Sequence, residues 1–148
     1  MKLLVSRTLT FQDPWPDGVD TVDEVGGVHL KYNNFPLSVR GLAQRSYEFL
    51  FGLKLLWLSR RYDAIAVGRY GIWFPVFKHF LGLRQRVVMM DIEWKNPMRG
   101  RIVRIASRAS VALCCFTRGE IERYSRSYGI PREKFAFLPC AFQRGDFL

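Results

Sequence analysis

The feature that most constrains the fold is a pattern that occurs three times between residues 62 and 142. A short apolar run is followed by a polar loop and then by a helix-like segment. Apolar strands that alternate with helices are typical of a parallel sheet covered on both faces. Such sheets bind their ligands at the carboxyl ends of the strands. The pattern therefore predicts an α/β domain with a mostly parallel sheet, and it indicates which loops to search for function.

Periodicity and turn residues place the individual elements along the chain. We expect strands over residues 63–68, 86–90, 111–116 and 134–138, and helices over 73–81, 99–108 and 118–128. The part of the chain before Tyr62 is less regular. It predicts strands over 3–5 and 25–32, and a helix that Ser38 caps and that runs to about residue 61.

Length and composition bound the class of protein. At 148 residues the chain is expected to be one domain, and 49% hydrophobic residues argue against disorder. A net charge of +10 favours anionic partners, namely lipid headgroups, nucleic acid or phosphorylated substrates.

Cys114 and Cys115 are neighbours in an expected strand, so they should point to opposite faces as small buried residues. Together with Cys140 they indicate a reducing, cytoplasmic location.

Neither a signal peptide nor a membrane span is expected. The apolar run at the start is far shorter than the apolar region of a signal peptide. The most apolar stretch, residues 49–58, contains Lys54 and has about half the ~20 residues that a membrane-spanning helix needs.

Several functional motifs are missing from the sequence. It contains no G-x-x-x-x-G-K-[ST] phosphate loop and no G-x-G-x-x-G fingerprint, so ATPase and dinucleotide-binding functions lack support. Neither histidine has a metal-ligand partner at a useful spacing, and no metal site is expected. His79 lies in an apolar helix, where we expect a half-buried packing role.

The loop after the strand at 86–90 holds the strongest candidates for chemistry. Asp91 or Glu93 could act as a general base or bind sugar hydroxyls, and Trp94 could stack on a sugar ring. An alternative of equal weight is that the two carboxylates cap the next turn or pair with Lys95 and Arg99.

The loop at residues 117–120 fits a capping box, in which Thr117 and Glu120 satisfy backbone N–H groups at the start of a helix. That structural role is favoured for Glu120. The N–H groups beside Gly119 could still bind an anion such as phosphate.

Two arginines and a tyrosine in other strand-end loops complete the set of candidates. Arg69 lies in a Gly68-Arg69-Tyr70-Gly71 turn, where it could contact an anion or remain solvated. Tyr70 lies beside it in the same loop, and Arg7 follows the strand at 3–5.

Two basic surfaces are predicted on helices. One consists of Arg101, Arg104 and Arg108, and the other of Arg40, Arg45, Lys54, Arg60 and Arg61. The simpler interpretation is a solvated face. The alternative is attachment to an anionic membrane, worth about 1 kcal/mol per basic residue, with Phe49, Phe51 and Trp57 at the interface. Nucleic acid is the least favoured partner, because no recognised motif is present.

The order of several short segments resembles one known family. The segments are Tyr62-Asp63-Ala-Ile, Arg86-Val-Val-Met-Met-Asp, Arg108-Ala-Ser-Val and the closing Gly129-Ile-Pro-Arg-Glu-Lys-Phe-Ala-Phe-Leu-Pro. Between Tyr62 and Phe147 their order and spacing resemble the amino-terminal domain of family 4-type glycosyltransferases of the GT-B fold. The family's E-x7-E donor-domain motif does not occur in the sequence.

The resemblance implies a Rossmann-like three-layer domain that forms half of a GT-B architecture, spans residues 1–148 and has its regular part at about 62–140. Such a half binds the acceptor, and a second domain or subunit, absent here, binds the nucleotide-sugar donor. No cofactor is expected in this chain itself.

The resemblance also implies roles for the candidate residues. Asp91, at about the place of a family histidine, and Glu93 would activate or position an acceptor hydroxyl. Arg7 and Arg69 would contact anions of the acceptor or donor. The remaining predicted substrate-binding residues are Tyr70, Trp94, Thr117, Gly119 and Glu120.

We therefore expect the acceptor-binding half of a glycosyltransferase, inactive alone, with a glycan or lipid-linked acceptor. The expected location is the cytoplasm, with peripheral attachment to the inner membrane face left open. The alternative is a non-catalytic membrane-surface or interaction module, because one scaffold supports many functions.

Overall fold

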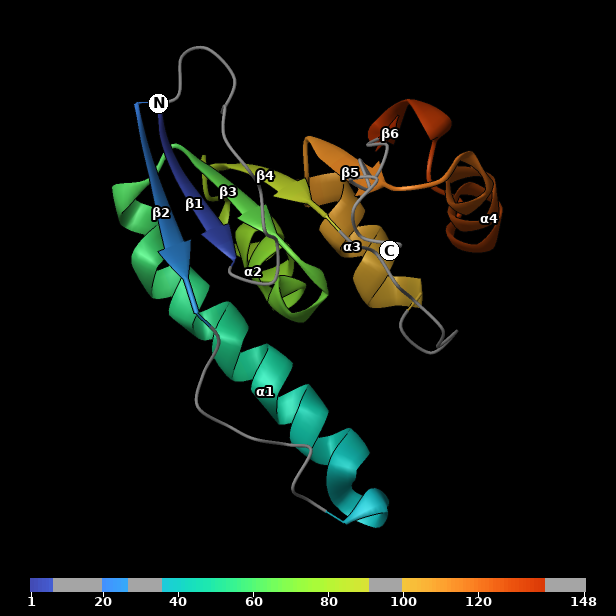
Figure 1. Cartoon of the computed structure of the whole chain (residues 1–148), viewed down its shortest axis with the longest axis horizontal. Coiled ribbons are helices and arrows are strands. Elements are labelled where there is room, and N and C mark those ends of the chain that lie inside the picture. The colour runs from blue at the N-terminus through green and yellow to red at the C-terminus, as the bar shows by residue number, and fades with distance from the viewer. Residues whose placement is uncertain (7–19, 27–35, 91–99, 138–148) are drawn as a thin grey trace, which may run out of the picture.

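The computed structural model describes residues 1–6, 20–26, 36–90 and 100–137. These residues form an α/β fold with one all-parallel sheet (Figure 1). The strands are β1 (Lys2–Ser6), β2 (Thr21–Val25), β3 (Ala64–Val67), β4 (Arg86–Met89), β5 (Ala112–Cys115) and β6 (Phe135–Phe137). The α-helices are α1 (Leu37–Leu58), α2 (Trp73–Leu81), α3 (Gly100–Ala109) and α4 (Arg118–Tyr128). Short 3-10 turns are η2 (Ser59–Arg61), η3 (Arg69–Gly71) and η5 (Arg132–Lys134).

The regular part of the chain follows the sequence pattern closely. The predicted bounds of α2 and α4 agree with the structure, and those of the other elements after Tyr62 differ only slightly. The helix ends also agree, because Gly82 and Gly129 both adopt the left-handed conformation that ends a helix, with φ of 63° and 61°. The prediction of the α/β class is thus confirmed.

For the part of the chain before Tyr62, one prediction is largely untested and another was wrong. The second strand covers Thr21–Val25, whereas the predicted strand over 25–32 lies mostly outside the described residues. Helix α1 is capped by Pro36 instead of Ser38, which lies within the helix. The Pro36 carbonyl accepts hydrogen bonds from the N–H groups of Val39 and Arg40, and these bonds set the start of the helix before Ser38.

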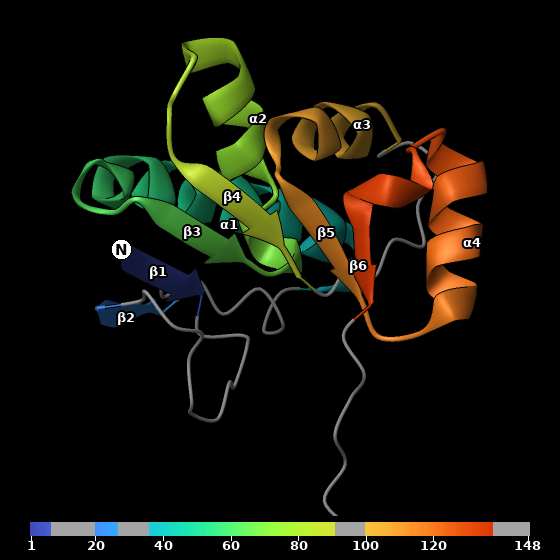
Figure 2. The ribbon, with the colours of Figure 1, turned by 90° about the horizontal axis from the view of Figure 1, so that it is seen from above.

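The strand order is β2-β1-β3-β4-β5-β6. Every connection from β2 onward steps across the sheet in the same direction, and parallel connections are almost always right-handed. Helices α1, α2, α3 and α4 must therefore lie on one face of the sheet. Figure 2 shows α2 and α3 above the strands and α1 passing behind β3 and β4. The arrangement is that of a Rossmann-like three-layer domain, of which the described residues supply the sheet and one helix layer.

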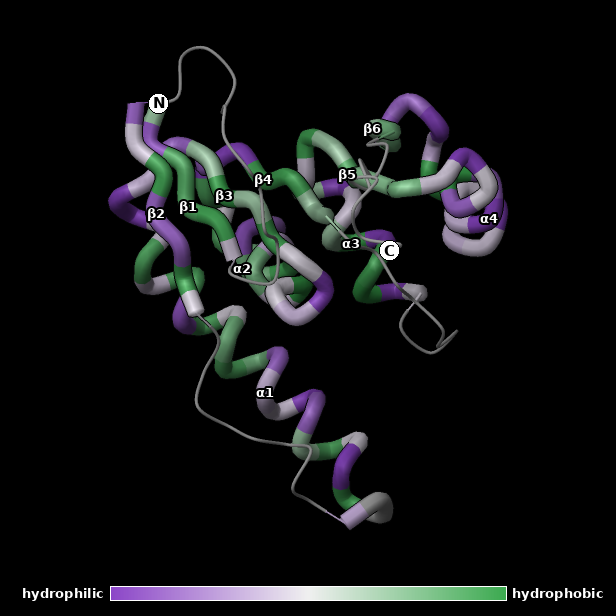
Figure 3. The backbone as a smooth tube through the Cα atoms, in the orientation of Figure 1, coloured by the Kyte–Doolittle hydropathy of each residue, from purple (hydrophilic) through white to green (hydrophobic). Residues whose placement is uncertain are grey.

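The two faces of the sheet contribute to different apolar clusters. Alternate strand residues such as Ile65 and Val87 face the helix layer, where Phe51 and Phe74 cover them. The opposite face carries a smaller cluster of Val5, Ala66, Met90 and Cys114. Figure 3 shows that apolar residues dominate β1, β3 and β4, as expected for buried parallel strands.

Helices α1 and α2 approach closely at Gly52. A Cβ atom built on this glycine would lie 2.5 Å from the Cβ of Trp73 and 3.2 Å from the Trp73 carbonyl carbon. No side chain larger than hydrogen fits there without displacing α2. None of the described helices is long and apolar enough to cross a membrane.

We predict that Gly52→Ala lowers the free energy of unfolding by about 1–3 kcal/mol, because the added methyl group overpacks the contact with Trp73. Gly41→Ala in the same helix is the control, since a Cβ at Gly41 meets nothing within 4 Å. Alanine is the better helix former, so this control should gain up to about 1 kcal/mol. Urea denaturation measures both, and equal effects would show that α1 and α2 do not meet at Gly52.

Cys114 and Cys115 lie on opposite faces of β5, as predicted, and both are buried free thiols. Burial, with a smaller contribution from the charge of Glu120, raises the pKa of Cys115 from 9.0 to about 12. Above pH 9 the unfolded chain therefore loses this proton while the folded chain retains it, and folding becomes less favourable as pH rises toward 12.

We predict that the free energy of unfolding of the native chain falls more steeply between pH 9 and 11 than that of Cys115→Ala. The difference should be at most about 1.4 kcal/mol per pH unit, the value for one proton. Urea denaturation at several pH values measures it. Parallel pH profiles for the two proteins would mean that the Cys115 thiol ionises normally in the folded state.

Candidate functional site

The candidate site lies at the carboxyl edge of the sheet, where β1 meets β3. Strand β1 pairs with β2 on one side and with β3 on the other. Along the chain, β2 is therefore added to one side of β1, and β3 and the later strands are added to the opposite side. In open parallel sheets this change of side leaves a crevice at the carboxyl ends of the two central strands, and ligands bind there. The corner is therefore the first place to look for functional side chains.

Ser6 and Gly68 join the two strands at this corner. Ser6 is the last residue of β1 and is fully buried, and its hydroxyl oxygen accepts a hydrogen bond from the Gly68 N–H at 3.1 Å. Gly71 then turns the chain back through η3, where a Cβ would lie 3.0 Å from Val67 and 3.1 Å from Leu55. Tight packing beneath the loop fixes the backbone positions of Arg69 and Tyr70, which lie between Gly68 and Gly71.

Arg69 and Tyr70 form an aromatic and cationic group at the corner. The Arg69 guanidinium donates a hydrogen bond to the Tyr70 hydroxyl and lies 4.6 Å from the centre of the Tyr70 ring. Tyr47 of α1 packs edge-on against Tyr70 with ring centres 5.5 Å apart. Burial and, to a lesser degree, the neighbouring Tyr70 raise the pKa of Tyr47 above its ordinary value.

The loop at the end of β5 is a capping box, as predicted. The Thr117 hydroxyl accepts from the Glu120 N–H at 3.1 Å, and the Glu120 carboxylate accepts from the N–H groups of Phe116 and Thr117 at 3.0 Å each. The carboxylate supplies the negative charge that a helix start favours. An anion bound beside Gly119 would have to compete with it, so the structural role of Thr117 and Glu120 is the stronger one.

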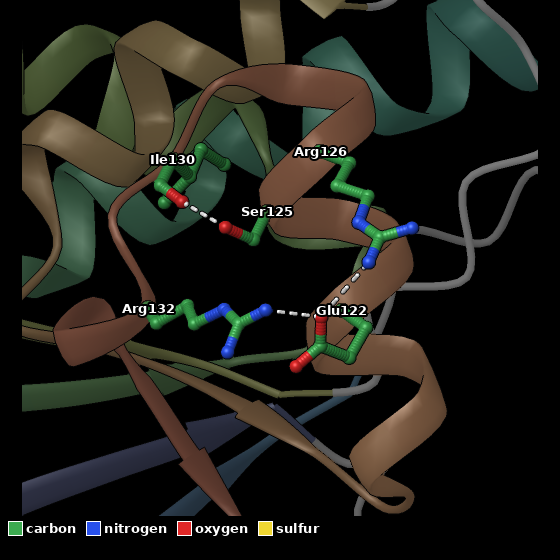
Figure 4. A network of polar contacts seen from close by, with 5 residues as sticks. All are labelled: Glu122, Ser125, Arg126, Ile130 and Arg132. Carbon is green, nitrogen blue, oxygen red and sulfur yellow. Dashed lines mark hydrogen bonds and ion pairs between the residues drawn. The ribbon is translucent and has the colours of Figure 1, made fainter.

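The segment after α4 is fixed by a small polar network (Figure 4). The Ser125 hydroxyl donates to the Ile130 carbonyl at 2.8 Å. Glu122 accepts a hydrogen bond from Arg132 and lies 3.7 Å from the Arg126 guanidinium. These contacts fold the closing Gly-Ile-Pro sequence back along α4, so this segment has a structural role in positioning β6.

The structure describes only part of the predicted site. Arg69 and Tyr70 meet at the β1–β3 corner. Thr117, Gly119 and Glu120 lie on the same edge, but β5 is two strand spacings from β3, about 10 Å. Four predicted residues, Arg7, Asp91, Glu93 and Trp94, lie outside the described residues.

Sequence reasoning missed Ser6 as a structural residue and Tyr47 as part of the corner. A serine that ends an apolar strand is a detectable signal, because a buried hydroxyl needs a partner. Tyr47 gives no such signal, since only tertiary packing brings α1 beside η3. His79 was predicted to be half-buried but is exposed, because α2 reaches its last turn there and the His79 ring contacts only Phe80 among the described rings.

The described residues contain no group of histidine, cysteine or carboxylate side chains that could hold a metal ion. Comparison of the chain with protein-family models and with curated proteins finds no match. The candidate site is therefore assigned from the structure of this chain alone.

We predict that Ser6→Ala lowers the free energy of unfolding by about 1–3 kcal/mol, because the buried Gly68 N–H loses its acceptor. Ser107→Ala is the matched control. Ser107 is also buried, but its hydroxyl bonds the Arg104 carbonyl of its own helix. That bond adds little to stability, so the control should lose less than about 0.5 kcal/mol. Thermal or urea unfolding compares the two, and equal losses would contradict a specific role for Ser6.

Proposed function

We propose that the chain is the acceptor-binding half of a glycosyltransferase that transfers a sugar from a nucleotide-sugar donor to a glycan or lipid-linked acceptor. The observation that carries the proposal is the β1–β3 corner, where a parallel sheet reverses its strand order and presents Arg69 and Tyr70. The order of segments that resembles family 4-type glycosyltransferases supports it as well.

The chemistry of the corner suits a sugar that carries an anionic group. A guanidinium binds phosphate oxygens through paired N–H donors. Aromatic side chains such as Tyr70 offer an apolar surface to the C–H face of a sugar ring. In this proposal Arg69 contacts an acceptor phosphate and Tyr70 orients the ring, while Arg7 and Trp94 assist from the neighbouring loops.

The reaction itself would need a second partner. Asp91 or Glu93 would accept the proton of the acceptor hydroxyl as its oxygen bonds to the anomeric carbon of the donor. The bond from that carbon to the nucleotide would break, and the nucleotide diphosphate would leave. A second domain or subunit would hold the nucleotide, so this chain alone would be inactive. We propose a cytoplasmic location at the inner membrane face.

A second candidate is a non-catalytic module that binds a membrane surface. It is supported by the exposed apolar and basic residues of α1 and η2, among them Trp57, Arg60 and Arg61. The two candidates differ in whether the β1–β3 corner binds a sugar.

Saturation-transfer NMR with hexose 1-phosphates, free hexoses and a UDP-hexose tests the proposal. We predict contact with the hexose 1-phosphates. Arg69→Gln should bind them about tenfold more weakly, because one charge-assisted hydrogen bond is lost. Arg126→Gln on α4 is the control and should bind as the native chain does.

Two results would contradict the proposal. One is tighter binding of the UDP-hexose than of any other sugar probe, which would indicate a donor-binding domain. The other is no contact with any sugar probe, which would favour the non-catalytic module.

A further inference from the structure

Helix α1 is apolar on two sides. Its inner side packs Phe51 and Leu55 into the main core, where both are almost fully buried. Its outer side exposes a second set of large apolar residues, which we call the outer face: Val39, Leu42, Phe49, Leu50, Leu53 and Trp57. At 100° per residue these positions fall within about a third of the helix circumference. The membrane-facing role predicted for Phe51 was therefore wrong, because Phe51 lies on the opposite side of the helix.

The outer face is too large to be a set of scattered surface residues. Leu42 is 69% exposed and Trp57 is 70% exposed, although they lie near opposite ends of the row. Phe49 is partly covered by the rings of Trp73 and Phe77 at 5.5 Å each. A helix of 22 residues is about 33 Å long, so the row extends along most of that length. Apolar patches of this extent mark interaction sites.

The charges beside the outer face are of one sign. Arg45, Arg60 and Arg61 are exposed, and the Arg61 guanidinium lies 5.9 Å from the centre of the Trp57 ring. Glu48 is the one acidic residue in the sequence of α1, η2, α2 and α3, and it is only 3% exposed. Lys54, predicted as part of the same surface, instead donates to the Gly26 carbonyl at 2.9 Å and ties α1 to the end of β2.

Among the described residues, the exposed acidic side chains lie outside α1, η2, α2 and α3. Asp20, Asp23, Glu24 and Asp63 lie in or beside β2 and β3, and all four are exposed. Asp20 pairs with the amino terminus, and Asp23 accepts a hydrogen bond from Tyr62. In the part of the chain that the structure describes, α1, η2, α2 and α3 therefore carry no exposed acidic side chain, whereas α4 carries Glu120 and Glu122.

We propose that the outer face of α1 docks on an anionic phospholipid bilayer, with α1 lying parallel to the membrane surface. Leucine, phenylalanine and tryptophan side chains would enter the boundary between headgroups and acyl chains, and the flanking arginines would contact anionic headgroups. A second copy of the chain fits this face poorly, because it would bring the arginines of both copies together. Interfacial charge pairs of like sign oppose association.

The placement of α1 relates this surface to the candidate site. Figure 1 shows the amino-terminal half of α1 projecting past the carboxyl ends of β1, β2 and β3. Tyr47 lies in that half and packs against Tyr70 at the β1–β3 corner. A membrane along the outer face would therefore pass close to the edge where a lipid-linked sugar would be bound. The docking itself uses no residue of the corner, so it stands independently of the proposed sugar binding.

Vesicle flotation with the full chain tests the inference. The probes are vesicles of phosphatidylcholine alone and vesicles in which a minor part of the phosphatidylcholine is replaced by anionic phosphatidylglycerol. We expect binding to the anionic vesicles only. The binding should weaken as salt is raised from about 0.05 to about 0.5 M, because the screening length shortens roughly threefold.

Two pairs of matched variants distinguish docking through the outer face from attraction of the vesicles to the net positive charge of the protein. Leu53→Gln with Trp57→Gln should weaken binding at least tenfold, whereas Val111→Gln with Phe137→Gln, which are also exposed, should not change it. Arg45→Gln, Arg60→Gln and Arg61→Gln together should weaken binding roughly 100-fold. The same total charge change at Arg118, Arg123 and Arg126 of α4 should have a much smaller effect.

Other outcomes would overturn the inference. If the two triple arginine variants lost vesicle binding equally, the vesicles would be attracted to the net charge of the chain and not to the outer face. Sedimentation analysis that finds a dimer, dissociated by Leu53→Gln with Trp57→Gln, would assign the face to a second copy. Monomeric protein that fails to float with anionic vesicles at low salt would likewise exclude a membrane role.

Discussion

The hydrogen-bonded ladder between β1 and β3 is the contact on which the rest of the structure depends. It pairs Leu3 with Ala64, Leu4 with Ile65 and Val5 with Ala66. This register brings the end of β1 beside the end of β3, so that the Ser6 hydroxyl can accept from the Gly68 N–H. A shift by one residue would turn the apolar side chains of β1 to the wrong face and would separate these two groups.

The same ladder determines where the helices lie. Because β1 is bordered by β2 and β3, every later crossover proceeds in one direction and deposits its helix on one face. Helix α1 consequently packs against the sheet with its inner side and against α2 at Gly52. Its outer side is left without a neighbour along most of its length among the described elements, which is why a surface rich in tryptophan, phenylalanine and leucine can face outward.

The loops after β5 and β3 differ in whether helix formation explains their polar side chains. At the end of β5 the capping box uses Thr117 and Glu120, so that loop is explained by helix formation. At the end of β3 the Arg69 and Tyr70 side chains make contacts with each other that helix formation does not require. The β1–β3 corner is therefore the better candidate for a ligand, and the arginines of α1 and η2 extend the basic character of the molecule along one side.

The sequence by itself determined the α/β class, the bounds of α2 and α4, the two glycine-ended helices, the capping box and the opposite orientations of Cys114 and Cys115. All of these depend on local spacing, on backbone preference or on the alternation of side chains along a strand. Tertiary structure alone decided the strand order, the burial of Phe51 and the meeting of Tyr47 with Tyr70. The physical reason is that α1 is apolar on two sides, so its sequence cannot indicate which side the core will cover. Only packing against the sheet and α2 makes that choice.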